Sequence, residues 1–149
     1  MDPVEELVQN LRFPQDKVAY AALKELIARS QATDQVYSFF DEFVTMLEDE
    51  NSLLRNRGLA LIAHNARWDI GGKLDGVLDA YLAHILDEKP ITARQCVQNL
   101  SYIVAARPDL ASKIRTALEY EDFSVYPDSM APLLEKDRIT ILKQIGLKS

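Results

Sequence analysis

The sequence predicts an all-α protein, a right-handed α-solenoid of about four antiparallel helix pairs in one domain over residues 1–149. Basic residues recur at intervals of 38, 39 and 42 residues, each followed by a leucine six positions later; they are Lys17, Arg55, Arg94 and Lys136. Apolar residues repeat at helical spacing, and no segment sustains the alternation of a strand. A period near 40 residues is typical of stacked helix pairs, because each pair has an apolar face that its neighbour covers.

The first four helices follow from capping residues and apolar spacing. The first is expected over residues 3–11, since Pro3 suits a first helical turn, and the second over 14–29. The third begins after Thr33 and Asp34, which are good N-cap types. The fourth follows residues 49–51 and runs to about Ala66. The apolar faces of the second and third helices are predicted to be Val18, Ala22, Leu23, Leu26 and Ile27, and Val36, Phe39, Phe40, Phe43, Val44 and Leu47.

The last four helices are bounded by glycine and proline. Gly71 and Gly72 break the helical pattern before a fifth helix. Pro90 opens the sixth, and the proline after Arg107 ends it. A loop leads from the seventh helix to the capping pair before the eighth, at residues 128 and 129. Inward-facing residues are predicted to be Leu74, Val77, Leu78, Tyr81, Leu82, Ile85, Ala93, Val97, Leu100, Ile103, Val104, Leu110, Ile114, Ala117, Leu118, Leu133, Leu134, Leu142 and Ile145.

Whole-chain properties exclude several classes of protein. No apolar run approaches the roughly 20 residues needed to span a bilayer, so we expect no membrane contact. The acidic N-terminus lacks the features of a secretory signal. Cys96 is the single cysteine, which favours a reducing, cytoplasmic location. The net charge of −6 disfavours a dedicated nucleic-acid binder.

Charge divides between the two helices of each pair. The second helices, here called B helices, are taken as residues 14–30, 51–68, 90–107 and 130–149, and together they carry +8, which leaves −14 for the rest. B helices usually line the concave surface of such a solenoid, so this surface is predicted to bind an acidic partner segment. The candidate binding residues are Lys17, Arg55, Arg57, Trp68, Arg94 and Lys136.

The alternative is a structural role for these basic residues, in which each pairs with an acid in a neighbouring loop and fixes the register of the stack. The acids that lie close enough in sequence are Asp16, Asp49, Glu50, Asp87, Glu88 and Glu135. Trp68 likewise has two interpretations, since it can anchor a junction between repeats or present a stacking surface.

The side chains that could take part in catalysis or bind a metal do not form a recognisable pattern. His64 and His84 fall on different helices, and His64 shares a column with Leu26, Ile103 and Ile145, which predicts a packed histidine. A transition-metal site needs three or four converging ligands. Cys96 precedes the apolar residue Val97, so we expect a buried, inert thiol. We therefore predict no enzyme activity, no cofactor and no metal.

The segments 54–61 (LRNRGLAL) and 93–100 (ARQCVQNL) resemble the second helix of HEAT-like repeats in the armadillo-like superhelix. The segments 65–69, 87–96 and 128–130 are similar to those of small Firmicutes proteins, some of which carry the label SufBD. That label implies iron–sulfur cluster assembly, whereas this chain has one cysteine and differs from the β-helix subunits of the same name.

Two functions from different classes follow. The first is a non-enzymatic protein-interaction scaffold or adaptor. The second is a nucleic-acid-binding or DNA-base-modifying protein, similar to the alkylpurine DNA glycosylases built on such repeats, with Trp68 and a nearby Asp as its support. Formation of a homo-oligomer is compatible with either function, because a short solenoid has two exposed ends.

Overall fold

The computed structural model describes residues 2–147, and this part of the chain contains helices and no strands. The predicted all-α class is therefore confirmed. Five short 3-10 helices are η1 (Val36–Phe39), η2 (Ala66–Trp68), η3 (Ala83–Leu86), η4 (Pro108–Leu110) and η5 (Phe123–Val125). The α-helices are α1 (Pro3–Asn10), α2 (Asp16–Ala32), α3 (Phe40–Met46), α4 (Ser52–Asn65), α5 (Lys73–Leu82), α6 (Pro90–Ala106), α7 (Ala111–Tyr120) and α8 (Ala131–Leu147).

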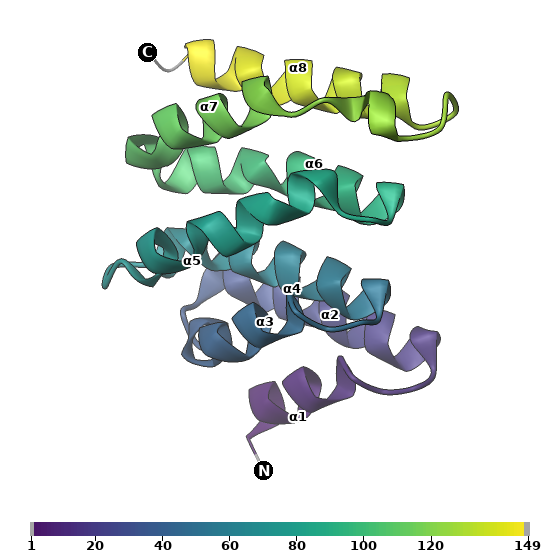
Figure 1. Ribbon diagram of the computed structural model, residues 1–149. Coiled ribbons are helices and arrows are strands. Elements are labelled where there is room, and N and C mark those ends of the chain that lie inside the picture. Colours follow the sequence, from purple (N-terminus) through teal and green to yellow (C-terminus); the bar gives the residue numbers. More distant parts are fainter. Residues whose placement is uncertain (1, 148–149) are drawn as a thin grey trace.

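The helices stack in chain order, with the two termini at opposite ends of the stack (Figure 1). Helices α1, α3, α5 and α7 form one layer, and the B helices α2, α4, α6 and α8 form the other (Figure 1). Neighbouring B helices pack on one another in the order α2, α4, α6, α8. Helices α1, α3 and α7 also pack on the B helices that follow them. No helix between residues 2 and 147 combines the length and the apolar composition that a membrane crossing requires.

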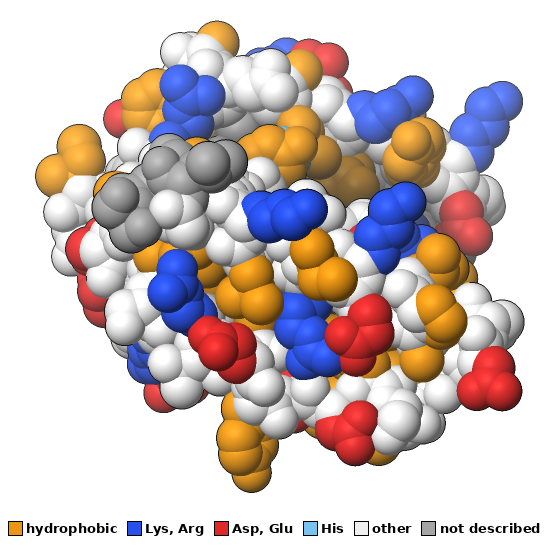
Figure 2. Space-filling model, turned by 90° about the horizontal axis from the view of Figure 1, so that it is seen from above, with side chains coloured by type: hydrophobic (Ala, Val, Ile, Leu, Met, Phe, Trp, Pro, Cys, Tyr) orange, Lys and Arg blue, Asp and Glu red, His pale blue; other side chains and the backbone are white. Residues whose placement is uncertain are grey.

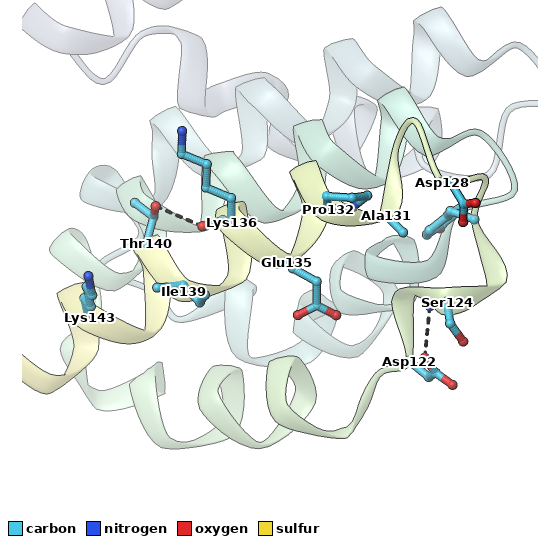
Figure 3. A pocket seen from close by; sticks show the side chains of 11 residues that line it. Asp122, Ser124, Asp128, Ala131, Pro132, Glu135, Lys136, Ile139, Thr140 and Lys143 are labelled. Carbon is cyan, nitrogen blue, oxygen red and sulfur yellow. Dashed lines mark hydrogen bonds between the residues drawn. The ribbon is translucent and has the colours of Figure 1, made fainter.

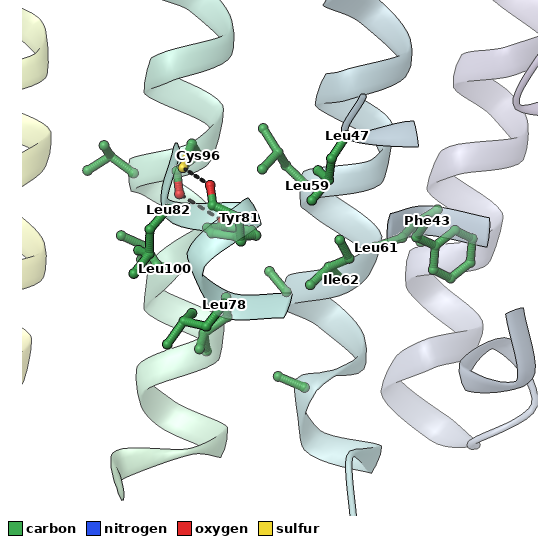
Figure 4. Packing of buried hydrophobic residues seen from close by; sticks show 14 of the residues in the cluster. Phe43, Leu47, Leu59, Leu61, Ile62, Leu78, Tyr81, Leu82, Cys96 and Leu100 are labelled. Carbon is green, nitrogen blue, oxygen red and sulfur yellow. Dashed lines mark hydrogen bonds between the residues drawn. The ribbon is translucent and has the colours of Figure 1, made fainter. Parts of the chain in front are cut away.

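The core lies between the two layers, where side chains of α3 and α5 meet those of α4 and α6 (Figure 4). Phe43, Leu61, Tyr81 and Leu100 have no exposed surface. Their burial follows the apolar spacing of the sequence, and removing such side chains from water supplies about 1.5–3 kcal/mol each.

Two side chains that were predicted to face inward are exposed. Val18 in α2 is 36% exposed and Leu133 in α8 is 38% exposed. In both helices the adjacent residue takes the inner position, because Ala19 and Leu134 are fully buried. Successive helical residues differ by about 100° in direction, so a residue at the edge of the apolar stripe can face solvent while its neighbour is buried. The predictions for Val18 and Leu133 were therefore wrong, whereas the prediction for Leu134 was correct.

The predicted third and fifth helices are each divided. Residues 36–39 form η1 before α3, and residues 83–86 form η3 after α5. The apolar spacing did not reveal these changes, because residues three apart lie on the same face of both helix types. Val36 and Ile85 are fully buried although they lie in the 3-10 segments.

Two positions in the structure favour glycine, each for a different reason. Gly72, with φ of 77°, precedes α5, and this positive φ favours glycine. Gly58 lies where α4 approaches α3. A Cβ atom at Gly58 would lie 2.7 Å from the carbonyl oxygen of Phe43 and 2.9 Å from Cβ of Met46. The contact between α3 and α4 therefore requires a residue without a side chain at position 58.

Candidate functional site

Arg55 lies inside the fold and connects three segments. Its Nε and Nη2 donate hydrogen bonds to the Asp87 carboxylate at 3.0 and 2.9 Å. Its Nη1 donates to the backbone carbonyls of Asp49 and Glu50, at 3.0 and 2.9 Å, just beyond α3. Only 7% of the Arg55 side chain is exposed. Arg55 and Asp87 thus form an internal pair of the kind that the structural alternative expects.

The Asp87 carboxylate also accepts hydrogen bonds from the Lys89 backbone N–H, at 2.9 Å, and pairs with Nδ1 of His84 at 2.7 Å. Burial would raise the pKa of Asp87, but the hydrogen bonds from Arg55, Lys89 and His84 outweigh burial and hold this pKa below its ordinary value. Asp87 is therefore a charged group that its surroundings stabilise in the folded state.

Arg57 and Arg138 also donate to the ends of first-layer helices. Arg57 is buried, and its Nη1 donates to the Leu11 carbonyl after α1 at 2.8 Å. Nη1 of Arg138 donates to the carbonyls of Leu118 and Glu121 at 2.8 and 2.6 Å. A cation there complements the negative end of the helix dipole. Arg138, two residues after Lys136, thus makes carbonyl contacts in the last pair like those that Arg55 makes in the second.

Arg94 pairs with an acid of the next helix pair along the chain. Its Nε and Nη2 donate to the Asp137 carboxylate at 2.8 and 3.2 Å, and Gln98 Nε2 donates to the same group at 3.3 Å. This pair joins α6 to α8. Sequence reasoning did not assign Asp137 to Arg94, although a separation of 43 residues, close to the repeat length, was a usable signal.

Trp68 and Asp69 lie at a junction between helix pairs. The indole Nε1 of Trp68 donates to the Ser30 carbonyl at 2.6 Å, which ties η2 to α2. The buried Asp69 carboxylate accepts from Nη1 of Arg107 at 3.0 Å, from Tyr37 Oη, and from the first two backbone N–H groups of α5. Burial and the hydrogen bond to Asp69 raise the pKa of Tyr37 to about 12. The geometry of Trp68 agrees with a junction anchor.

Cations without an ion pair gather in the B layer. Within residues 2–147, seven Lys or Arg side chains have no acidic partner within 4 Å, and five of them lie on α2, η2 and α8. We call these five the basic set: Lys17, Lys24, Arg67, Lys136 and Lys143. The other two are Lys89, in the loop before α6, and Arg115, on α7.

Every described acid of the B helices has a basic partner. The pairs are Asp16 with Arg57, Glu25 with Arg29, Glu135 with Arg138, and Asp137 with Arg94. Acids without an ion pair in residues 2–147 lie in the first layer and the loops instead. Figure 2 shows the α8 end of the stack, where basic side chains lie among hydrophobic and acidic ones. The surface of the B layer is therefore cationic although the chain as a whole is acidic.

Two adjoining hollows cross the middle of this surface, and we call them together the B groove. The first, of about 490 Å³, lies between α2, α4 and α6, and the second, of about 420 Å³, lies between α4, η2 and α6. His64 lines both. Tyr20 and Tyr102, which are 58% and 48% exposed, line the first and the second hollow respectively.

His64 was predicted to be a packed histidine, and it is partly buried. Its ring lies against Tyr102, with centroids 4.0 Å apart. Burial lowers the pKa of His64, so the ring is neutral at pH 7. The ring is therefore packed as predicted, but it lies at the edge of the B groove, whereas Ile103 in the same column is fully buried.

A third hollow, of about 810 Å³, lies beside α8 at the end of the stack (Figure 3). Lys136, Lys143 and Ile139 line it together with Asp122 and Asp128. Figure 3 shows the Lys136 side chain leaving α8 in a different direction from Glu135. This hollow has unpaired charges of both signs, whereas the Asp16 that lines the first hollow of the B groove pairs with Arg57, and the charged residue that lines the second hollow is Arg67. The second hollow of the B groove therefore complements an anionic partner better.

Groups for catalysis or metal binding do not converge in the described structure. Cys96 is fully buried, its Sγ donates to the Tyr81 carbonyl at 3.4 Å, and burial raises the pKa of the thiol. Among residues 2–147, no three His, Cys, Asp or Glu side chains are grouped so that they could hold a metal ion. Comparison with protein-family models, with curated proteins and with solved structures gives no match for this chain.

Proposed function

We propose that this chain is a non-enzymatic interaction scaffold, a HEAT-like right-handed α-solenoid that binds an acidic segment of a partner protein on its B layer. The stacking of helix pairs in chain order supports the HEAT-like interpretation. The observation that carries the function is the separation of unpaired charges. All acids of the B helices are paired, whereas five cations of the same layer are not.

The dimensions of the surface favour an extended ligand. Packed helices lie about 8–10 Å apart, so four B helices span about 30 Å from the first axis to the last. An extended chain rises about 3.3 Å per residue, and about nine residues would cross this distance. Lys17 and Lys24 lie on α2 at one end, and Lys136 and Lys143 lie on α8 at the other. The B groove with its exposed tyrosines lies between them.

The internal contacts revise the set of binding residues. Lys17 and Lys136 belong to the basic set, and both are exposed. Arg55, Arg57 and Arg94 already donate to groups of the fold. Their charge reversal would disturb packing as well as the surface field, because a buried charge without its partner is unfavourable. We therefore assign the binding role to Lys24, Arg67 and the remaining lysines of the basic set.

A charge-reversal experiment tests this proposal. The probe is a fluorescein-labelled peptide of about twelve residues, rich in Glu and spaced with Gly, and its affinity is measured by anisotropy at low ionic strength. We expect Lys24→Glu/Arg67→Glu to weaken binding about tenfold, since each reversal changes the interaction by about 0.5–1 kcal/mol. The matched control is Lys89→Glu/Arg115→Glu, which changes the net charge equally at the two unpaired cations outside the basic set.

The outcomes separate the two candidate functions. Unchanged affinity in the control and a loss in the B-layer variant support a scaffold for acidic segments. Equal losses in both variants, or no binding by the wild-type chain, reject it. A single-stranded oligonucleotide of equal charge forms a parallel arm. Tighter binding of the oligonucleotide, with an affinity that falls steeply with salt, would favour a nucleic-acid-binding function instead.

A further inference from the structure

The second hollow of the B groove is lined by small, aromatic and basic residues. Ala63, Ala105 and Ala106 lie along it, and none of them extends beyond its Cβ atom. His64, Tyr102 and Arg67 complete the lining together with Gln31. Its volume of about 420 Å³ is within the usual range of ligand pockets, about 300–1,000 Å³. We call this hollow the Tyr102 recess.

We infer that the Tyr102 recess receives one aromatic side chain of the acidic segment, and this inference rests on the proposed function. The rings of His64 and Tyr102 already lie in tilted contact at 4.0 Å, and almost half of the Tyr102 surface is exposed. A third ring can pack against this pair, and aromatic pairs add about 0.5–1.5 kcal/mol to the gain from buried area. The neutral state of His64 at pH 7 keeps this wall free of a buried charge.

Arg67 favours a ligand in which an acidic residue lies next to the aromatic residue. Its guanidinium carbon lies 5.1 Å from the centroid of the Trp68 ring, and the hydrogen bond from Trp68 to Ser30 fixes that ring. Arg67 is exposed and has no acidic partner among the described residues. A carboxylate next to the aromatic residue would complete a pair with a guanidinium that is already held in place. The preferred ligand is therefore an aromatic residue flanked by Asp or Glu.

The test compares two labelled peptides that differ in one central residue. Both have the acidic composition used above, and one has Phe where the other has Ala. We expect the Phe peptide to bind the wild-type chain about tenfold more tightly, the effect of partly burying one such side chain. Ala105→Leu should remove this preference, because its side chain occupies the recess. Leucine is a good helix former, so this variant should fold.

Ala83→Leu is the matched control, since Ala83 is exposed on η3 in the other layer and lines no described hollow. Retention of the Phe preference in Ala83→Leu and its loss in Ala105→Leu support the inference. Equal binding of both peptides by the wild-type chain overturns the aromatic preference and leaves the proposed function intact. A Phe preference that persists in Ala105→Leu overturns the assignment to this recess. Binding of neither peptide rejects the proposed function together with the inference.

Discussion

Replacement of Arg55 by alanine tests whether the contact between the second and third helix pairs depends on one buried ion pair. Arg55→Ala removes two hydrogen bonds to Asp87 and two to the carbonyls after α3. The Asp87 carboxylate stays in place with 3% of its side chain exposed. The substitution therefore leaves a buried negative charge whose remaining donors are a backbone N–H and His84.

The expected cost follows from this geometry. Removing one partner of a buried pair costs about 3–5 kcal/mol, mainly because the other charge remains buried and uncompensated. Small domains unfold with a total free energy of about 5–15 kcal/mol, so Arg55→Ala should remove a large part of the stability. Arg94→Ala is the comparison, because the Arg94 side chain is 30% exposed and water can solvate Asp137 after its removal. We expect Arg94→Ala to cost about 1–2 kcal/mol.

Urea denaturation followed by far-ultraviolet circular dichroism measures both values, provided that the slope of unfolding free energy against urea is unchanged. The double substitution Arg55→Ala/Asp87→Ala completes a thermodynamic cycle, and it should be more stable than Arg55→Ala because the buried charge is gone. A cost below about 1 kcal/mol for Arg55→Ala, or equal costs for Arg55→Ala and Arg94→Ala, would contradict the structural role of the buried pair.

Three further outcomes are expected. Gly58→Ala should destabilise the chain by about 1–3 kcal/mol in the same urea assay, because the added Cβ overlaps Phe43 and Met46; a stabilised variant would contradict the close approach of α3 and α4. The pKa of Asp87 is lowered in the folded state, so the contribution of Asp87 to the free energy of unfolding is complete above the unfolded pKa and is lost as pH falls through the folded pKa. Below about pH 4 the wild-type chain should therefore lose stability more steeply than Asp87→Asn. Parallel curves of unfolding free energy against pH for the two proteins would contradict this. Cys96 should react with a thiol reagent only when urea unfolds the chain, since it is buried and its pKa is raised; rapid labelling of the native protein would show that the thiol is accessible.

The apolar pattern predicted the helix order because it reports a local property. Leu61, Leu100 and Phe43 are buried where helical periodicity placed them. Two positions at the edge of an apolar stripe were predicted wrongly. Val18 and Leu133 differ from their buried neighbours by one residue, and only the packing of adjacent helices determines which of two neighbouring side chains faces inward.

The polar contacts were harder to predict, because their partners come from other repeats. Arg55 and Asp87 are 32 residues apart, and Arg94 and Asp137 are 43 apart. The spacing pattern aligned Lys136 with Arg55, whereas the contacts align Arg138. A two-residue change in register is invisible when both candidates are basic residues on the same helix. The B groove was not predicted either, because Tyr20, His64 and Tyr102 line its two hollows only when α2, α4 and α6 are stacked.

The internal ion pairs and the proposed binding surface depend on each other. Asp137 is the most buried acid of the B helices. Arg94 pairs with Asp137 and so neutralises its negative charge within the B layer. Loss of Arg94 would expose that charge near Lys136, and the surface would become less cationic even though no residue of the basic set had changed. Arg94→Gln should therefore weaken binding of the acidic peptide without direct contact, and Arg94→Gln/Asp137→Asn should restore it. A loss that the double variant does not restore would show that Arg94 itself contacts the ligand, as the sequence pattern predicted.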